Sequence, residues 1–101
     1  MPKQWGFLTN HALVLIQVFE HPRSTLREIS QAVGITERAA LSILRQMEDE
    51  ACVQRTREGR RVRYTVNLPA IMKKKTRLPY NVEQIVRAIA RLFDELRETE
   101  E

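Results

Sequence analysis

The chain has 101 residues, 43% hydrophobic and 30% charged, which is typical of one small globular domain rather than a disordered tail. No apolar run approaches the ~20 residues that span a bilayer, and the start MPKQWGFLTNH lacks the pattern of a signal peptide, so we expect a cytoplasmic protein. Cys52 is the only cysteine, which excludes an intrachain disulfide and a Cys-rich zinc site. We interpret it as a small core residue.

The positive charge is concentrated in one segment. Between Val53 and Arg77 nine residues are Lys or Arg and one, Glu58, is acidic, so this segment carries +8 and the remainder −4, which together give the net charge of +4. An excess confined to one segment favours a polyanion-binding face over a generally charged surface. Nucleic acid is therefore the expected partner.

Two helices are expected near the start of the chain. NHALVLIQVFEH is too long and too rich in apolar residues for a one-sided strand, and Thr9 or Asn10 can cap it as a helix that His21-Pro22 stops. STLREISQAVG has the T-x-x-E spacing of a capping box at Thr25 and Glu28. Gly34 fits the end of this second helix, because glycine readily takes the left-handed conformation that closes a helix.

A third helix is expected almost at once, in GITERAALSILRQMEDE, where Thr36 can cap it. Two helices joined by a short turn with glycine make a helix-turn-helix. At about 100° per residue, the apolar side of this helix is expected to face the core with Ala40, Ile43, Leu44, Met47 and Ala51. The other side carries Arg38, Ser42 and Arg45, whose small and guanidinium side chains suit guanine edges or phosphates. A solvated helix face would show the same pattern.

A β-hairpin is expected next, because VQRTREGRRVRYTV contains two β-prone runs around a Glu58-Gly59 turn. Its tip and exposed face are expected to carry five arginines: Arg55, Arg57, Arg60, Arg61 and Arg63. Phosphate is the anion that matches such a density of positive charge. The alternative is a charged hairpin that stays soluble and resists edge pairing.

In this order, LREISQAVGITERAALSILRQMEDEACVQRTREGRRVRYTV resembles the winged helix-turn-helix transcription regulators, and it is most similar to the small ArsR-like and MarR-like bacterial repressors. The resemblance covers about residues 8–68 and is carried by ITERAA and RTREGRRVRYTV. It implies that the third helix enters the major groove of DNA and that the hairpin is a wing led by Arg60 and Arg61, lying against the minor groove or phosphates. The implied DNA-contacting residues are Thr36, Glu37, Arg38, Ala39, Ser42, Arg45, Arg55, Arg57, Arg60, Arg61 and Arg63.

The sequence departs from the metal-sensing ArsR-like pattern, because LREISQAVGI contains no Cys or His. His11 and His21 have no second ligand nearby in sequence, so we interpret them as polar or capping residues. No metal and no cofactor are expected. The chain is also shorter than MarR-like chains and lacks their extended helical arms, and the sequence assigns no small-molecule effector.

Residues 1–68 are thus interpreted as the DNA-binding domain, residues 69–80 as a basic connector and residues 81–101 as a C-terminal helix. The run Lys73-Lys74-Lys75 of the connector could reach phosphate or stay hydrated. Asn81, with Gln84 at the box position, is expected to cap the last helix. The helix carries a broad apolar stripe: Val82, Ile85, Val86, Ile89, Leu92, Phe93 and Leu96.

This stripe is expected to pack against a second copy of the chain, giving a homodimer. The first helix and the start of the chain, with Trp5, Phe7 and Leu8, are expected to share that interface. The alternative is a monomer in which the last helix folds back on its own domain.

The predicted fold class is mainly α with a small β-hairpin, a winged helix-turn-helix with an added C-terminal dimerisation helix. The predicted function is sequence-specific binding of double-stranded DNA by a dimeric transcriptional regulator, a repressor by resemblance. Two alternatives stay open: a winged-helix module for protein contacts, and an architectural protein that binds DNA without sequence preference. An enzyme is not expected, because the sequence shows no nucleophile and base pair and no glycine-rich phosphate loop. Structured RNA fits the charge, although its major groove is too narrow for a helix.

Overall fold

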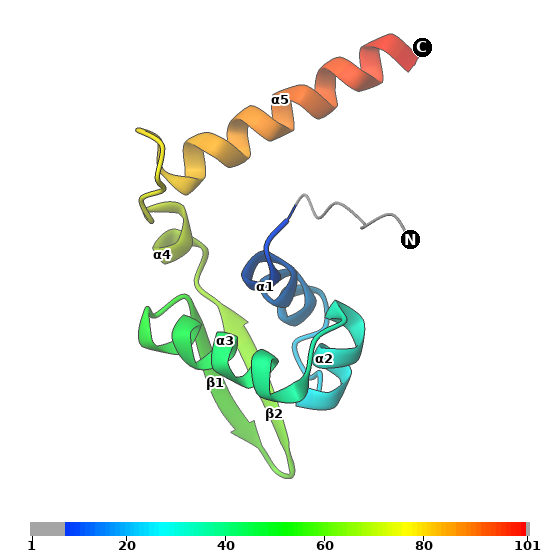
Figure 1. Ribbon diagram of the computed structural model, residues 1–101, viewed down its shortest axis with the longest axis vertical. Coiled ribbons are helices and arrows are strands. Elements are labelled where there is room, and N and C mark those ends of the chain that lie inside the picture. Colours follow the sequence, from blue (N-terminus) through cyan, green and yellow to red (C-terminus); the bar gives the residue numbers. More distant parts are fainter. Residues whose placement is uncertain (1–7, 101) are drawn as a thin grey trace. The chain divides into compact units, whose positions relative to one another are not determined.

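The computed structural model describes the backbone of residues 8–100 and the side chains of residues 8–98. Trp5 and Phe7 lie outside the described residues. The chain divides into two compact units, one ending at Asn67 and the other beginning at Leu68. The order of elements is α1, α2, α3, β1 and β2 in the first unit, followed by α4 and α5 in the second (Figure 1).

The first unit begins with α1 (Asn10–Glu20) and α2 (Leu26–Val33). Thr9, rather than Asn10, caps α1, and its hydroxyl accepts a hydrogen bond from the Ala12 amide at 3.2 Å. The predicted capping box of α2 is confirmed, because Thr25 and Glu28 exchange side-chain and backbone hydrogen bonds of 3.1 Å each. The bond from the Thr25 amide is the main cause that lowers the pKa of Glu28.

The third helix, α3 (Glu37–Asp49), follows after a turn of three residues that starts at Gly34. The Thr36 hydroxyl accepts from the Ala39 amide at 3.0 Å, so the predicted cap is confirmed. The prediction for Ala51 was wrong, because α3 ends before it and the residue is exposed. Ala51 takes a left-handed conformation, with φ of 60°, as the chain turns from α3 into the hairpin.

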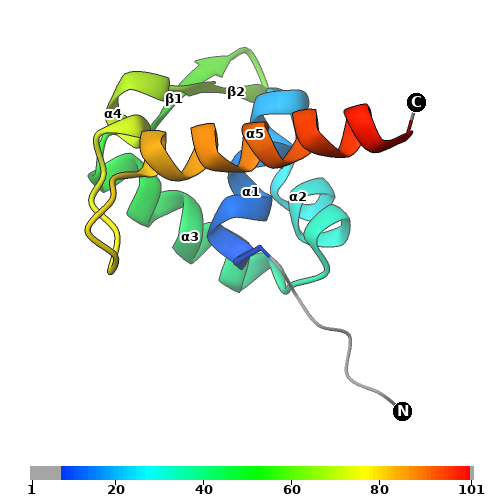
Figure 2. The same cartoon turned by 90° about the horizontal axis from the view of Figure 1, so that it is seen from above.

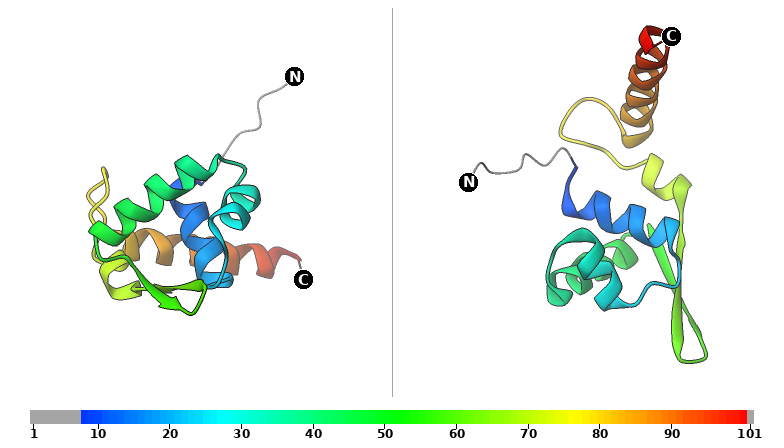
Figure 3. Two further views of the ribbon diagram at one scale, coloured as in Figure 1. Left: turned by 90° about the horizontal axis from the view of Figure 1, so that it is seen from below. Right: turned by 90° about the vertical axis from the view of Figure 1, so that its right-hand side faces the viewer.

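The wing is an antiparallel pair of strands, β1 (Val53–Glu58) and β2 (Arg61–Val66). Because Glu58 pairs with Arg61, the turn consists of Gly59 and Arg60, one residue later than predicted. Gly59 has φ of +61°, and a left-handed glycine at the first loop position is typical of a type II′ hairpin turn. Figure 3 shows the hairpin extending past the three helices of this unit.

The core of the first unit lies where α1, α2, α3 and the hairpin contact one another. Figure 2 shows the three helices crossing rather than lying parallel. The buried residues include one side of α3, as predicted, and Cys52, which is a free, buried core cysteine. The buried apolar residues of this unit are Val14, Val18, Ile29, Ala40, Ile43, Leu44, Met47, Cys52, Val53 and Tyr64.

The second unit contains the short helix α4 (Leu68–Met72) and the long helix α5 (Val82–Glu100). The expected connector therefore begins with a helical turn that the sequence analysis did not predict. Asn81 and Gln84 form the predicted capping box, with hydrogen bonds of 2.9 and 2.8 Å. Within the described part of the chain, no helix combines the length and the apolar character that crossing a membrane requires.

The turn between α2 and α3 gives a prediction about stability. Gly34 has φ of +82°, and a Cβ added there would meet nothing within 4 Å, so a Gly34→Ala variant suffers backbone strain without a clash. We expect Gly34→Ala to lower the free energy of unfolding by about 1–2 kcal/mol, measured by urea denaturation. Ala51→Gly, at a left-handed alanine, is the matched control and should not destabilise the protein. Equal stability of wild type and Gly34→Ala would contradict this account.

Candidate nucleic-acid interface

The outward side of α3 is polar and accessible. Thr36, Glu37, Arg38, Ser42 and Arg45 are exposed, and Ala39 is half-buried. Of these predicted DNA-contacting residues, Arg38, Ser42 and Arg45 share the side of α3 opposite the buried residues at about 100° per residue, and Thr36 and Glu37 lie at the start of the helix. The opposite side is buried in the core, so α3 is held with its polar side outward.

α3 is also fixed to α1 by a polar contact. His11 Nε2 lies 2.6 Å from the Oε1 atom of Gln46, which links α1 to the second half of α3. His21 is the C-cap of α1, and its carbonyl accepts hydrogen bonds from the amide and the hydroxyl of Ser24. Both histidines thus serve as polar or capping residues, as predicted. Among the described residues, no group of three or more His, Cys, Asp or Glu could hold a metal ion.

The hairpin register distributes the five wing arginines over both faces of the wing. Arg55 pairs with Tyr64 and Arg57 with Val62, so these two arginines lie on the face that also carries the apolar residues of β2. Arg61 and Arg63 lie on the opposite face, and Arg60 is in the turn. All five arginines are exposed and Arg60 is at the tip, as expected, but the four strand arginines do not share one face, because strand side chains alternate and β1 and β2 contribute arginines in opposite phase.

The inner face of the wing is tied to α3. Arg55 Nε lies 3.4 Å from Glu48 Oε1, and Arg55 faces Tyr64, which is 8% exposed. Burial raises the pKa of Tyr64, against a smaller lowering effect of Arg55. Arg57 Nε donates a hydrogen bond of 3.3 Å to the Gly59 carbonyl, inside the wing itself. Arg55 therefore links the wing to α3, while Arg57 supports the turn.

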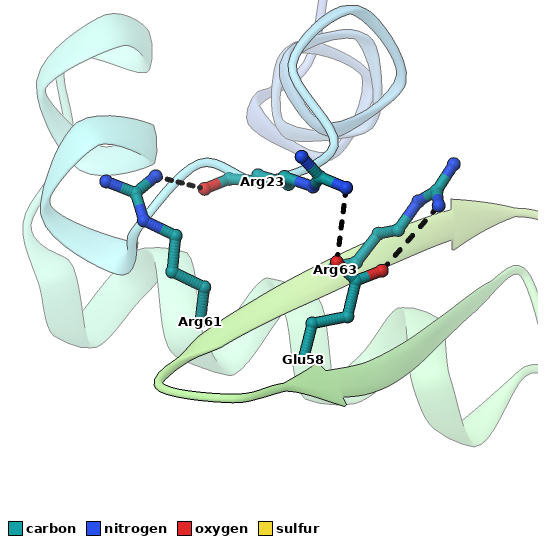
Figure 4. Close-up of polar contacts among 4 residues, drawn as sticks. All are labelled: Arg23, Glu58, Arg61 and Arg63. Atoms are coloured by element: carbon teal, nitrogen blue, oxygen red, sulfur yellow. Dashed lines mark hydrogen bonds and ion pairs between the residues drawn. The ribbon is translucent and has the colours of Figure 1, made fainter.

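The outer face carries a second cluster, drawn in Figure 4. Glu58 forms ion pairs with Arg23 at 3.2 Å and with Arg63 at 3.6 Å. Arg61 Nη1 donates a hydrogen bond of 3.4 Å to the carbonyl of Arg23. The backbone is joined here too, because the Tyr64 amide donates to the Pro22 carbonyl at 2.8 Å. The segment between α1 and α2 thus lies along β2.

Arg23 belongs to this cationic surface, although the sequence analysis did not single it out. It stands between two helices and outside the basic segment, and its partner Glu58 is 35 positions further along the chain. No local spacing rule links two such positions.

A small pocket opens between the start of α2, α3 and the wing. Its volume is about 280 Å³. Four arginines contribute to its lining, Arg23, Arg55, Arg60 and Arg61. The remaining lining is Ser24, Thr25, Leu26, Leu41, Val62 and Tyr64. A concave site with four cations and no acidic residue in its lining suits an anion such as a phosphate group.

The candidate dimer residues lie in the second unit, on α5. Val82, Ile85 and Ile89 are half-buried, and the rest of the stripe is exposed. Leu92 is 64% exposed, Phe93 61% and Leu96 53%. These residues recur at three- and four-residue intervals, so they form one apolar side of the helix. A row of large apolar side chains with more than half of their surface exposed is unusual on a monomeric protein and is typical of an interaction surface.

Comparison with solved structures identifies the fold. A structure of MepR, a transcription regulator of the Staphylococcus aureus multidrug efflux pump MepA, matches with a TM-score of 0.58 at 20% identity, over 90% of this chain and 61% of that one. The S. aureus MepR–DNA complex matches with a TM-score of 0.58 at 20% identity, over 92% of this chain and 69% of that one. A MarR family protein from Bacillus stearothermophilus matches with a TM-score of 0.52 at 18% identity, over 96% and 78%.

The chain therefore has the winged helix-turn-helix fold of MarR-type transcription regulators, as the sequence predicted. It spans 61% of the length of the MepR chain. No protein-family model and no curated protein matches the sequence. At 18–20% identity, this likeness establishes the fold alone.

Proposed function

We propose that the protein binds double-stranded DNA in a sequence-specific manner, as a dimeric transcriptional regulator that represses by occupying its site. The observation that carries the proposal is the placement of α3, with Arg38, Ser42 and Arg45 exposed, beside a pocket lined by four arginines. The solved complex of MepR with DNA, which has the same fold, supports this reading.

In this proposal α3 reads the bases. An α-helix fits the major groove of B-form DNA, and the start of a recognition helix contacts base edges. Thr36, Arg38 and Ser42 would lie near bases, with Glu37 and Ala39 between them, and Arg45 would reach the backbone. Arg38 can donate two hydrogen bonds to a guanine edge, which makes it the main candidate for sequence preference.

The wing and its pocket would hold the sugar-phosphate backbone. A phosphate in the pocket would be within reach of Arg23, Arg55, Arg60 and Arg61, and forked guanidinium donors match phosphate oxygens. Such contacts fix the protein on the duplex and supply affinity that does not depend on sequence. Arg57 and Arg63 add charge to the two faces of the wing.

α5 would join two copies of the chain. Burying the four exposed apolar side chains of the stripe, Val86, Leu92, Phe93 and Leu96, at about 1.5 kcal/mol each gives a gross gain on the order of 6 kcal/mol per copy, before the costs of association. Two copies related by a twofold axis would present two α3 helices about 34 Å apart, one turn of DNA. The proposal therefore includes a site with two inverted halves.

Salt dependence tests the proposal directly. We expect fluorescence anisotropy with a labelled duplex of random sequence to show an affinity that falls roughly a thousandfold between 50 and 200 mM salt, as for about six phosphate contacts. No salt-dependent binding to duplex DNA would contradict DNA binding and favour a module for protein contacts.

Selection from a pool of random duplexes distinguishes a sequence-specific regulator from an architectural protein that binds DNA without sequence preference. A consensus with two inverted halves is expected for the dimeric regulator. Binding without any consensus would instead indicate an architectural DNA-binding protein, because contacts limited to phosphates carry no sequence information.

A further inference from the structure

Glu58 is the only acidic residue between Val53 and Arg77, and it occupies an unusual place. It lies on the outer face of the wing, where its two carboxylate oxygens engage two different arginines, Arg23 at 3.2 Å and Arg63 at 3.6 Å (Figure 4). The side chain of Glu58 is 37% exposed, and those of Arg23 and Arg63 are 63% and 52% exposed. A single carboxylate thus engages Arg23, which lines the proposed phosphate pocket, and Arg63, which lines the neighbouring groove together with Arg23.

We propose that Glu58 is a specificity determinant that limits sequence-independent binding to DNA by holding Arg23 and Arg63 on itself. The inference rests on the proposed function and deepens it. A carboxylate and a phosphate diester accept hydrogen bonds from the same guanidinium donors, so the two anions compete for these arginines. A phosphate that approaches the outer face also meets the negative charge of Glu58.

Phosphate can compete with Glu58 for Arg23 and Arg63, because both ion pairs are exposed to solvent. Exposed ion pairs are weak and are screened by salt, so Glu58 cannot exclude phosphate, but it lowers what each phosphate contact contributes. The effect falls on backbone contacts alone. Glu58 lies on the face opposite Arg55, the residue that links the wing to α3, and its ion-pair partners Arg23 and Arg63 are both outside α3.

The test compares Glu58→Gln with Glu20→Gln. Both substitutions remove one negative charge. Glu20 lines the same groove as Arg23, Arg61 and Arg63, with a volume of about 880 Å³, but it makes neither of the two ion pairs of Glu58. The measurement is the affinity for a random-sequence duplex, by fluorescence anisotropy over a series of salt concentrations, with the full chain.

We expect Glu58→Gln to raise the affinity for random duplex by about three- to tenfold at low salt, and Glu20→Gln by less than about twofold. The salt dependence of Glu58→Gln should steepen by about one to two counterions, because one or two arginines become available to phosphates. The ratio of affinities for the selected site and for random duplex should fall accordingly.

Arg63→Ala supplies a second, independent measurement. This substitution should lower random-duplex affinity more in the Glu58→Gln background, where Arg63 is released from its ion pair, than in the wild type. Equal gains in Glu58→Gln and Glu20→Gln would mean that only net charge matters and would overturn the inference. A loss of affinity in Glu58→Gln would overturn it as well, because Glu58 would then serve to shape the wing.

The two proposals fail differently. If the wild type binds duplex DNA with a steep salt dependence and Glu58→Gln matches it, the inference about Glu58 is wrong and the proposed function stands. If the wild type binds no duplex at all, the proposed function is wrong, and the inference falls with it.

Discussion

Replacing Leu92 and Phe93 of α5 by glutamate is expected to leave a monomer whose affinity for a duplex with two inverted half-sites is lower by about a hundredfold or more. Both residues are more than 60% exposed and lie within the apolar stripe of α5. Two carboxylates buried at a dimer interface without partners would cost far more than the packing they replace. Each monomer would then bind one half-site, without the gain from joining two.

Light scattering after size-exclusion chromatography measures the first part of this prediction, because the chain mass is 11.9 kDa and a dimer has twice that mass. Arg91→Glu is the matched control: it also changes the charge by two, and Arg91 lies on the side of α5 opposite the stripe at 100° per residue. The control should remain a dimer. A wild type that is monomeric at micromolar concentration would remove the dimer from the proposal.

Local chemistry explains why so many element ends could be predicted. The capping boxes at Thr25 and Asn81 and the left-handed Gly34 each depend on residues within three or four positions of one another. Such bonds form wherever the helix forms, so the sequence alone indicates them. The buried and exposed sides of α3 follow from helical periodicity in the same way. The exception is Ala51, which lies beyond the end of the helix and is therefore exposed.

The arrangement of the wing could not be predicted to the same depth. A turn placed one residue later shifts every cross-strand partner by two positions, so Arg55 faces Tyr64 rather than Val62. The pairing of Arg23 with Glu58 depends on the segment after α1 lying along β2, a contact between distant parts of the sequence. α4 was missed because five residues are too few to show helical periodicity.

The residues assigned to reading bases and those assigned to holding phosphates should respond differently to substitution. Removing both Arg60 and Arg61 is expected to weaken binding to every duplex about tenfold or more and to reduce the salt dependence by about two counterions. Both line the anion-suited pocket, and Arg60 stands exposed in the turn of the wing. The double substitution Arg87→Ala and Arg91→Ala in α5 removes the same charge and should have a smaller effect.

Arg38→Ala should instead change which sequence is preferred, because loss of a forked contact to one base pair costs about 1–3 kcal/mol at that position only. Ser42→Ala should act in the same sense through a neighbouring position on the same side of α3. The measurement is a repeated selection from random duplexes with each variant, alongside anisotropy on the wild-type consensus. If Arg60→Ala with Arg61→Ala leaves random-duplex binding unchanged, the wing does not hold phosphates. If Arg38→Ala keeps the wild-type consensus, α3 does not read bases through Arg38.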